Sequence, residues 1–133
     1  MTVLLNIDVP DLERAVSFYT RAFGLSVGRR LGGRVVELVG WPVPVFLLQG
    51  RTGSTGADGD RRRYERHWTP VHLDVVVDDI GGALARAVEA GAVVERDVRV
   101  EVWGKIAALA DPFGHGLCLI EFLGRGYDEI ADV

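Results

Sequence analysis

The sequence contains an internal repeat, and this feature constrains the fold more than any other. Residues 4–12 align without a gap with residues 72–80, and both segments have the pattern of a strand that runs into a helix. A repeat of this kind within 133 residues indicates one supersecondary unit that occurs twice. The chain is therefore predicted to contain two copies of one folded unit.

Each copy continues with an amphipathic helix that has a start signal and a stop signal. Asp11 and Asp79 are predicted N-caps, because a carboxylate can accept hydrogen bonds from the free amides of the first helical turn. Gly24 and Gly91 are predicted to end the two helices. The apolar residues of both helices recur at helical spacing: Leu12, Ala15, Val16, Tyr19, Ala22 and Phe23 in the first, and Ile80, Ala83, Leu84, Ala87 and Ala90 in the second.

Three short strand-like runs follow each helix, so both copies have the order βαβββ and the predicted class is α+β. The predicted strands are 25–31, 34–39 and 43–49 in the first copy, and 92–98, 105–110 and 116–122 in the second. One domain over 1–133 is expected, with module one at 1–50, a flexible linker at 51–67, module two at 68–123 and a C-terminal tail at 124–133. The linker is rich in glycine and small polar residues, and it is either a lid over a ligand or a disordered segment.

Composition narrows the range of partners. A formal charge of −4 disfavours a nucleic-acid backbone, and no apolar run approaches the roughly 18 to 20 residues that cross a bilayer. A cytoplasmic protein is expected, with neither nucleic acid nor membrane as a partner. Arg61, Arg62, Arg63 and Arg66 are interpreted as a solvated loop, with contact to an anionic ligand as the alternative.

The duplicated unit, the helix motif of residues 11–25 and the turn Asp-Pro-Phe-Gly-His-Gly at 111–116 resemble the vicinal oxygen chelate superfamily. This group includes glyoxalase I, bleomycin-resistance proteins and extradiol dioxygenases. The resemblance implies two βαβββ modules that form an eight-stranded, incomplete barrel around a cleft for metals, drugs or metabolites. It also implies a homodimer.

Metal-dependent members of this superfamily draw their ligands from the first and last strands of both units. In this chain the resemblance assigns those positions to Leu4, Phe46, His72 and Cys118. Only His72 is a good ligand, and His72 with Cys118 falls short of the three protein ligands typical of catalytic zinc. No metal cofactor is therefore expected. The alternative is a divalent metal on His72 and Glu121, although strand alternation points Glu121 away from the cleft.

His72 is the candidate general acid or base, with a packed, hydrogen-bonded histidine as the other interpretation. Residues on the same faces, or near strand ends, are candidates for ligand binding. The polar candidates are Asn6 and Asp74, and the apolar or aromatic ones are Leu4, Phe46, Trp68, Trp103 and Cys118.

These observations favour a metal-independent protein that binds a small hydrophobic or aromatic molecule, as bleomycin-resistance proteins do. The alternative is a metal-dependent lyase, isomerase or dioxygenase that acts on a substrate with vicinal oxygens. Fold class alone does not choose between the two, because one fold supports many chemistries.

Overall fold

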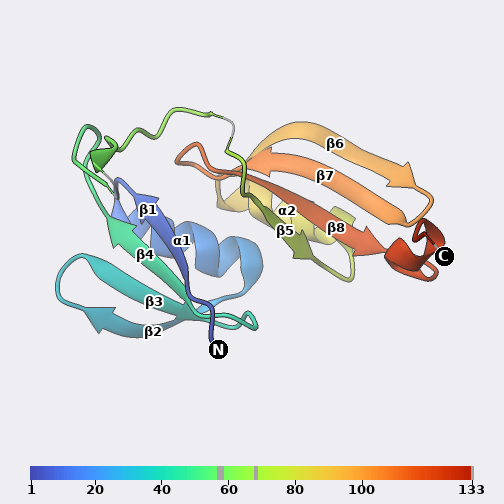
Figure 1. Cartoon of the computed structure of the whole chain (residues 1–133), viewed down its shortest axis with the longest axis horizontal. Coiled ribbons are helices and arrows are strands. Elements are labelled where there is room, and N and C mark those ends of the chain that lie inside the picture. The colour runs from blue at the N-terminus through green and yellow to red at the C-terminus, as the bar shows by residue number, and fades with distance from the viewer. Residues whose placement is uncertain (57–58, 68, 133) are drawn as a thin grey trace. The chain divides into compact units, whose positions relative to one another are not determined.

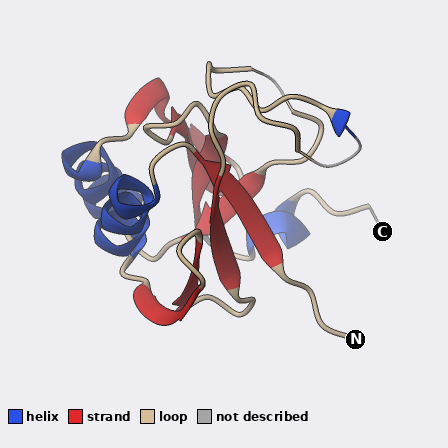
Figure 2. Cartoon of the chain, turned by 90° about the vertical axis from the view of Figure 1, so that its left-hand side faces the viewer, coloured by secondary structure: helices blue, strands red, loops and turns tan. Residues whose placement is uncertain are grey.

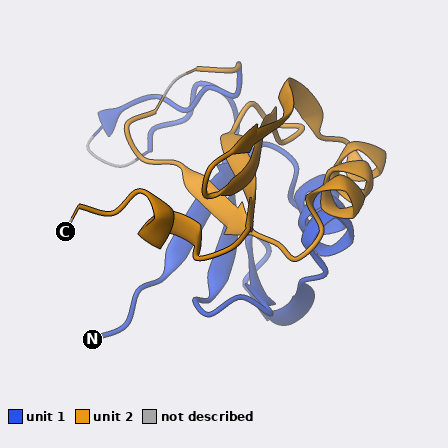
Figure 3. Cartoon of the chain, turned by 90° about the vertical axis from the view of Figure 1, so that its right-hand side faces the viewer, with its two compact units in different colours: residues 1–65 blue, residues 66–133 orange. Residues whose placement is uncertain are grey.

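The computed structural model describes residues 1–56, 59–67 and 69–132. The chain divides into two compact units, residues 1–65 and 66–133 (Figure 3). Over the described residues, each unit contains one α-helix and one mixed four-stranded sheet, coloured by type in Figure 2. The predicted α+β class and the repeated βαβββ order are confirmed.

In unit 1 the first and last strands are neighbours. The sheet order is β1-β4-β3-β2, with β1 parallel to β4 and the other pairs antiparallel. Its elements are β1 (Leu5–Val9), α1 (Leu12–Phe23), β2 (Ser26–Leu31), β3 (Val35–Val39) and β4 (Val45–Gln49).

Unit 2 repeats this topology with the order β5-β8-β7-β6, and α2 lies behind the sheet in Figure 1. Its elements are β5 (Leu73–Val76), α2 (Ile80–Ala90), β6 (Val93–Glu101), β7 (Gly104–Ala110), β8 (Gly116–Phe122) and the 3-10 helix η2 (Gly126–Glu129). The strand β6 runs three residues past the predicted end at 98, because its ladder with β7 continues to the pair Glu101 and Gly104.

Both helices begin and end where the sequence predicts. The Asp11 side chain accepts a hydrogen bond from Arg14 N, and Asp79 accepts one from Gly82 N. Gly24 ends α1 with a φ of 68°, a left-handed conformation that glycine adopts without a Cβ clash. The two N-cap residues therefore fix the point after the first strand at which each helix begins.

The core of each unit lies between its helix and one face of its sheet. In unit 1, α1 buries Phe18 and Tyr19 almost completely, and the strands bury residues such as Val45 and Leu47. Alternation along each strand leaves the other face without a helix. We call this second surface the helix-free face of the sheet, and it carries the candidate site residues.

The described residues of the predicted linker divide between the two units: residues 51–56 and 59–65 belong to unit 1, and Arg66 and His67 belong to unit 2. Arg62 Nε lies 2.7 Å from Asp8 Oδ2, and the Tyr64 hydroxyl donates to the Gly50 carbonyl at 2.6 Å. These contacts hold the segment against the end of β1 and β4. Among the described residues, no helix is both long and apolar enough to cross a membrane.

Candidate functional site

The register of the two sheets identifies equivalent positions in the two units. On the helix-free faces, Asn6 pairs with Phe46 across β1 and β4, and Asp74 pairs with Cys118 across β5 and β8. Asn6 is therefore the counterpart of Asp74, and Phe46 is the counterpart of Cys118. Leu4 lies two residues before Asn6, and His72 lies two residues before Asp74. These two residues are therefore counterparts as well.

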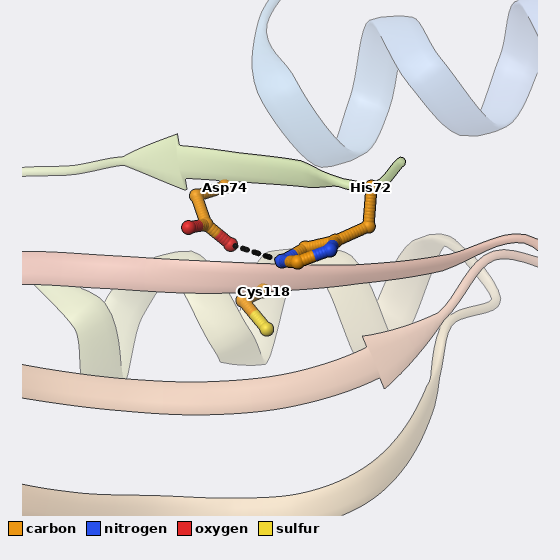
Figure 4. A group of neighbouring side chains, drawn as sticks. All are labelled: His72, Asp74 and Cys118. Atoms are coloured by element: carbon orange, nitrogen blue, oxygen red, sulfur yellow. Dashed lines mark ion pairs between the residues drawn. The ribbon is translucent and has the colours of Figure 1, made fainter. Parts of the chain in front are cut away.

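Unit 2 brings three chemically active side chains together on its helix-free face (Figure 4). His72 Nε2 lies 3.3 Å from Asp74 Oδ1. One donor atom from each of His72, Asp74 and Cys118 lies within 4.8 Å of the others. His72 and Asp74 are exposed and Cys118 is half-buried. The sequence identified all three residues, but it did not predict that they form a single group.

The Cys118 thiol is held in its protonated form. Burial raises its pKa, and the neighbouring Asp74 raises it further through its negative charge and by accepting a hydrogen bond from the thiol. A thiolate is the reactive and metal-binding form of cysteine. The raised pKa lowers the thiolate fraction, which disfavours Cys118 as a nucleophile.

Two cavities have Cys118 as a lining residue, and all of their lining residues belong to unit 2. We call the first, of about 170 Å³, the histidine pocket because His72 lines it. The second, of about 290 Å³, is lined by Arg96 and Arg99, and we call it the arginine pocket. Arg66, Glu95, Ala108 and Cys118 line both cavities. Cys118 thus belongs to the surface that the two cavities share, which we call the cavity floor.

Arg66 and Glu95 form a two-pronged ion pair beside this floor. Arg66 Nε lies 2.7 Å from Glu95 Oε2, and Arg66 Nη2 lies 2.9 Å from Glu95 Oε1. The hydrogen bonds to Arg66 lower the pKa of Glu95. Sequence reasoning missed this feature, because it grouped Arg66 with a solvated loop and did not consider Glu95. The one available signal was the alternative that this arginine cluster contacts an anion.

The helix-free face of unit 1 has different chemistry at the equivalent positions. Leu4 is 55% exposed, and Phe46 replaces a thiol with an aromatic ring. On the same face, the Glu37 carboxylate is buried and accepts three hydrogen bonds from Arg29, two from the guanidinium and one from the backbone amide. The pKa of Glu37 is lowered by these contacts. Asn6 is exposed at the edge strand.

Glu121 and its counterpart Gln49 lie on the helix-covered faces, as strand alternation predicts. Glu121 Oε1 accepts a hydrogen bond from Ile80 N at 2.9 Å, and Gln49 Oε1 accepts one from Leu12 N at 3.3 Å. Glu121 also lies 3.7 Å from Lys105 Nζ. The structure therefore places Glu121 at the start of α2 and away from His72, which counts against these two residues as a metal pair.

Two tryptophans were predicted to contact a ligand. Trp68 lies outside the described residues. Trp103 lies at the start of β7 and packs on Phe122 and Tyr127, with ring centroids 6.2 and 5.1 Å away. It lines neither the histidine pocket nor the arginine pocket. The ring contacts give Trp103 a packing role next to η2.

The residues do not fit the two-unit metal site that the resemblance implies. Two of its four positions, Leu4 and Phe46, have only hydrocarbon side chains. Asp74 adds an oxygen donor to His72 and Cys118, so unit 2 reaches the three protein ligands typical of catalytic zinc. Binding of a metal by Cys118 would require loss of the thiol proton.

Comparison with known proteins identifies the family. A sequence model of the family described as "Glyoxalase-like domain" matches residues 4–120. An uncharacterized protein of Mycobacterium bovis is 40% identical over 121 residues, which cover 80% of this chain and 74% of that protein.

Two solved structures show the same fold. The fosfomycin resistance protein FosX of Listeria monocytogenes has a TM-score of 0.73 at 15% identity, with 98% of both chains covered. TnmS3 of Streptomyces sp. CB03234, described as an antibiotic binding protein, has a TM-score of 0.64 at 23% identity, with 92% of this chain and 96% of TnmS3 covered. The chain therefore belongs to the glyoxalase-like domain family of the vicinal oxygen chelate superfamily.

Proposed function

We propose that this chain is a small-molecule-binding protein of the glyoxalase and bleomycin-resistance type that holds its ligand without a metal. The observation that carries the proposal is the register of the two sheets. It gives His72 and Cys118 the counterparts Leu4 and Phe46, neither of which can coordinate a cation. Side chains of this composition are suited to contact with an organic ligand.

The lining of the two cavities indicates the chemistry of the ligand. Ala108 and Ile106 offer apolar surface, while His72 and the arginines supply hydrogen-bond donors and positive charge. We infer an amphiphilic ligand with an apolar or aromatic body and one acidic or hydrogen-bond-accepting group. This extends the small hydrophobic or aromatic ligand expected from the sequence.

Each candidate residue has a distinct role in this proposal. His72 binds the polar group of the ligand, and Asp74 orients the imidazole through the 3.3 Å contact. Cys118 forms part of the floor. Leu4, Asn6, Phe46, Trp68 and Trp103 stay predicted ligand contacts.

The similar proteins support this proposal in general terms. TnmS3 is described as an antibiotic binding protein and FosX as a fosfomycin resistance protein, so the fold is used in proteins that engage small organic molecules. We also propose a cytoplasmic homodimer, as the superfamily resemblance implies. Light scattering on the purified protein would test this with a mass of twice 14.5 kDa.

The second candidate function is an enzyme, and the contact between His72 and Asp74 favours it. A carboxylate that orients an imidazole leaves the other ring nitrogen available as a general base. In the metal-dependent version, a divalent metal would act as a Lewis acid on vicinal oxygens of a substrate. That version is the weaker of the two, because Leu4 and Phe46 of unit 1 offer no atom that can bind a metal.

Titration with benzoate, followed by amide chemical shifts, tests the binding proposal. Benzoate combines an aromatic ring with a carboxylate and is a minimal probe of the proposed ligand class. We expect saturable shifts at amides around the two cavities, such as Ala108 and Cys118. Replacing His72 with alanine should weaken binding about fivefold or more, the loss expected for one hydrogen bond of roughly 1 kcal/mol.

The variant His67→Ala is the matched control, because it removes a histidine that lines neither cavity, and its affinity should equal that of the unmodified chain. Benzamide, which lacks the charge, should bind more weakly than benzoate. Shifts that do not saturate, or an affinity that His72→Ala leaves unchanged, would contradict the proposal.

A further inference from the structure

We propose that the ion pair of Arg66 and Glu95 is a removable partition that divides the ligand cavity of unit 2 and limits the size of ligand it accepts. The inference rests on the proposed function, because it assumes that the two cavities receive a ligand. It assigns a specificity-determining role to two residues that do not belong to the His72 group.

The position of Arg66 is fixed by three hydrogen-bonding nitrogens. Two of them bind Glu95, at 2.7 and 2.9 Å, and Nη1 donates to the carbonyl of His67. Three of the five guanidinium N–H donors, including the Nε and Nη2 pair that faces Glu95, are therefore already used by protein groups. An arginine of this kind forms a wall, and a ligand carboxylate would have to displace Glu95 in order to bind it.

A glycine on β8 makes room for this wall. A Cβ at Gly116 would lie 2.3 Å from Arg66 Nη2 and 2.7 Å from its Cζ, which is much closer than two such atoms can approach. The position therefore accepts the guanidinium only because it has no side chain. Gly116 also starts the strand that carries Cys118 on the cavity floor.

Cavity volumes show what the partition does. The histidine pocket measures about 170 Å³ and the arginine pocket about 290 Å³, and both fall below the roughly 300 to 1,000 Å³ of ordinary ligand sites. Arg66, Glu95, Ala108 and Cys118 line both cavities, so the ion pair belongs to the surface that the two cavities share. Removing the pair would join them into one space of ordinary size.

The partition is also able to open. The side chains of Arg66 and Glu95 are 41% and 32% exposed, so water can solvate both charged groups when the pair separates, which limits the cost of separation. A larger ligand that supplied its own contacts to Arg66 or Glu95 would therefore separate the pair at small cost. The ion pair thus limits the size of ligand that the cavity accepts, except for a ligand that can separate Arg66 from Glu95.

Cys118 is a built-in reporter of this partition, because it is the chain's single cysteine and lines both cavities. The experiment compares its reaction rates with two neutral thiol reagents, the small methyl methanethiosulfonate and the bulky 4,4′-dithiodipyridine. Both react with the thiolate. The ratio of the bulky to the small rate therefore cancels changes in the thiol pKa and reports access alone.

Three single substitutions open the partition in different ways. Arg66→Ala and Glu95→Ala remove opposite charges, whereas Gly116→Ala displaces the guanidinium without any change in charge. We expect the rate ratio to rise in all three variants, by about tenfold, because access limits the bulky reagent. The double variant Arg66→Glu with Glu95→Arg should return the ratio towards that of the unmodified chain.

Arg125→Ala is the matched control, since it removes an arginine that is ion-paired with Glu129 and lines neither cavity, and its ratio should stay unchanged. Circular dichroism would verify that every variant is folded. An unchanged ratio in all three opening variants, or opposite changes in Arg66→Ala and Glu95→Ala, would overturn the partition. The proposed function would fail separately, through loss of saturable benzoate binding.

Discussion

The chemistry of single residues in the site is set by close neighbours more than by residue type. Cys118 has an elevated thiol pKa because it is half-buried and because Asp74 adds a negative charge and a hydrogen-bond acceptor. The same carboxylate contacts His72. Asp74 therefore controls both groups, which is a larger role than its position on an edge strand predicts.

Replacing Asp74 with asparagine should lower the pKa of the Cys118 thiol without restoring its ordinary value. The substitution removes the negative charge, but burial, the largest cause of the shift, stays. Thiolate absorbance measured against pH would give the value. Asp97→Asn is a suitable control, because Asp97 lines the arginine pocket but does not perturb the thiol. A thiol pKa that stays the same or increases in Asp74→Asn would contradict this assignment.

The second residue-scale prediction concerns Glu37. Its pKa is lowered in the folded state by Arg29, so its ionisation stabilises the fold above the ordinary glutamate pKa of about 4.3. That contribution disappears as the pH falls through the lower folded-state pKa. We expect Glu37→Gln to lower Tm at neutral pH, and the difference from the unmodified chain to shrink in acid.

Thermal unfolding followed over a pH series would check this prediction. Glu13→Gln is the comparison, because Glu13 and Arg30 form an exposed pair with 69% and 50% of their side chains accessible, and such pairs stabilise little. A Tm difference for Glu37→Gln that grows below about pH 4 would reverse the expected sign and refute the argument.

At the scale of elements, the last strand of each unit also caps the helix of that unit. Gln49 and Glu121 both accept a hydrogen bond from the first helical amide. The substitution Glu121→Leu should therefore cost about 1 to 3 kcal/mol of unfolding free energy, because it leaves the Ile80 amide without its partner. Glu121→Gln keeps an acceptor and should cost much less. Equal losses in chemical denaturation would contradict the capping role.

Most elements could be predicted from the sequence because each of them has a local signal. The helix boundaries are marked by the N-caps Asp11 and Asp79 and by the C-cap Gly24. Because the unit is repeated, an element predicted in one copy is also predicted in the other. The apolar stripe of α1 was less accurate. Phe18 is almost fully buried although the predicted stripe did not include it, while Phe23, which the stripe did include, is only partly covered. The Phe18 ring packs edge to face on the rings of Tyr19 and Phe23, and this contact is not part of the helical spacing.

The candidate site could be predicted only in part. Strand alternation placed Asp74 and Cys118 on one face, and the alignment of the copies gave the counterparts Asn6 and Phe46. The pairing of Arg66 with Glu95 could not be predicted, because it joins residues 29 positions apart and depends on the path of an irregular segment. No periodic pattern encodes such a contact.

At the scale of the whole molecule, duplication of one unit has produced two sheets with different chemistry. The helix-free face of unit 2 carries His72, Asp74 and Cys118 above two cavities, whereas unit 1 carries Leu4, Asn6 and Phe46. The two units share topology, helix caps and strand register. Their divergence at the equivalent positions is what separates this chain from a two-unit metal site.

Elemental analysis of the purified, untagged protein, in parallel with His72→Ala, tests the central claim most directly. A protein that binds its ligand without a metal should contain far less than one zinc, nickel, iron or manganese ion per chain, and the variant should give the same result. Nearly one ion per chain that disappears in His72→Ala would contradict the claim, and would make a metal-dependent enzyme on His72, Asp74 and Cys118 the leading account.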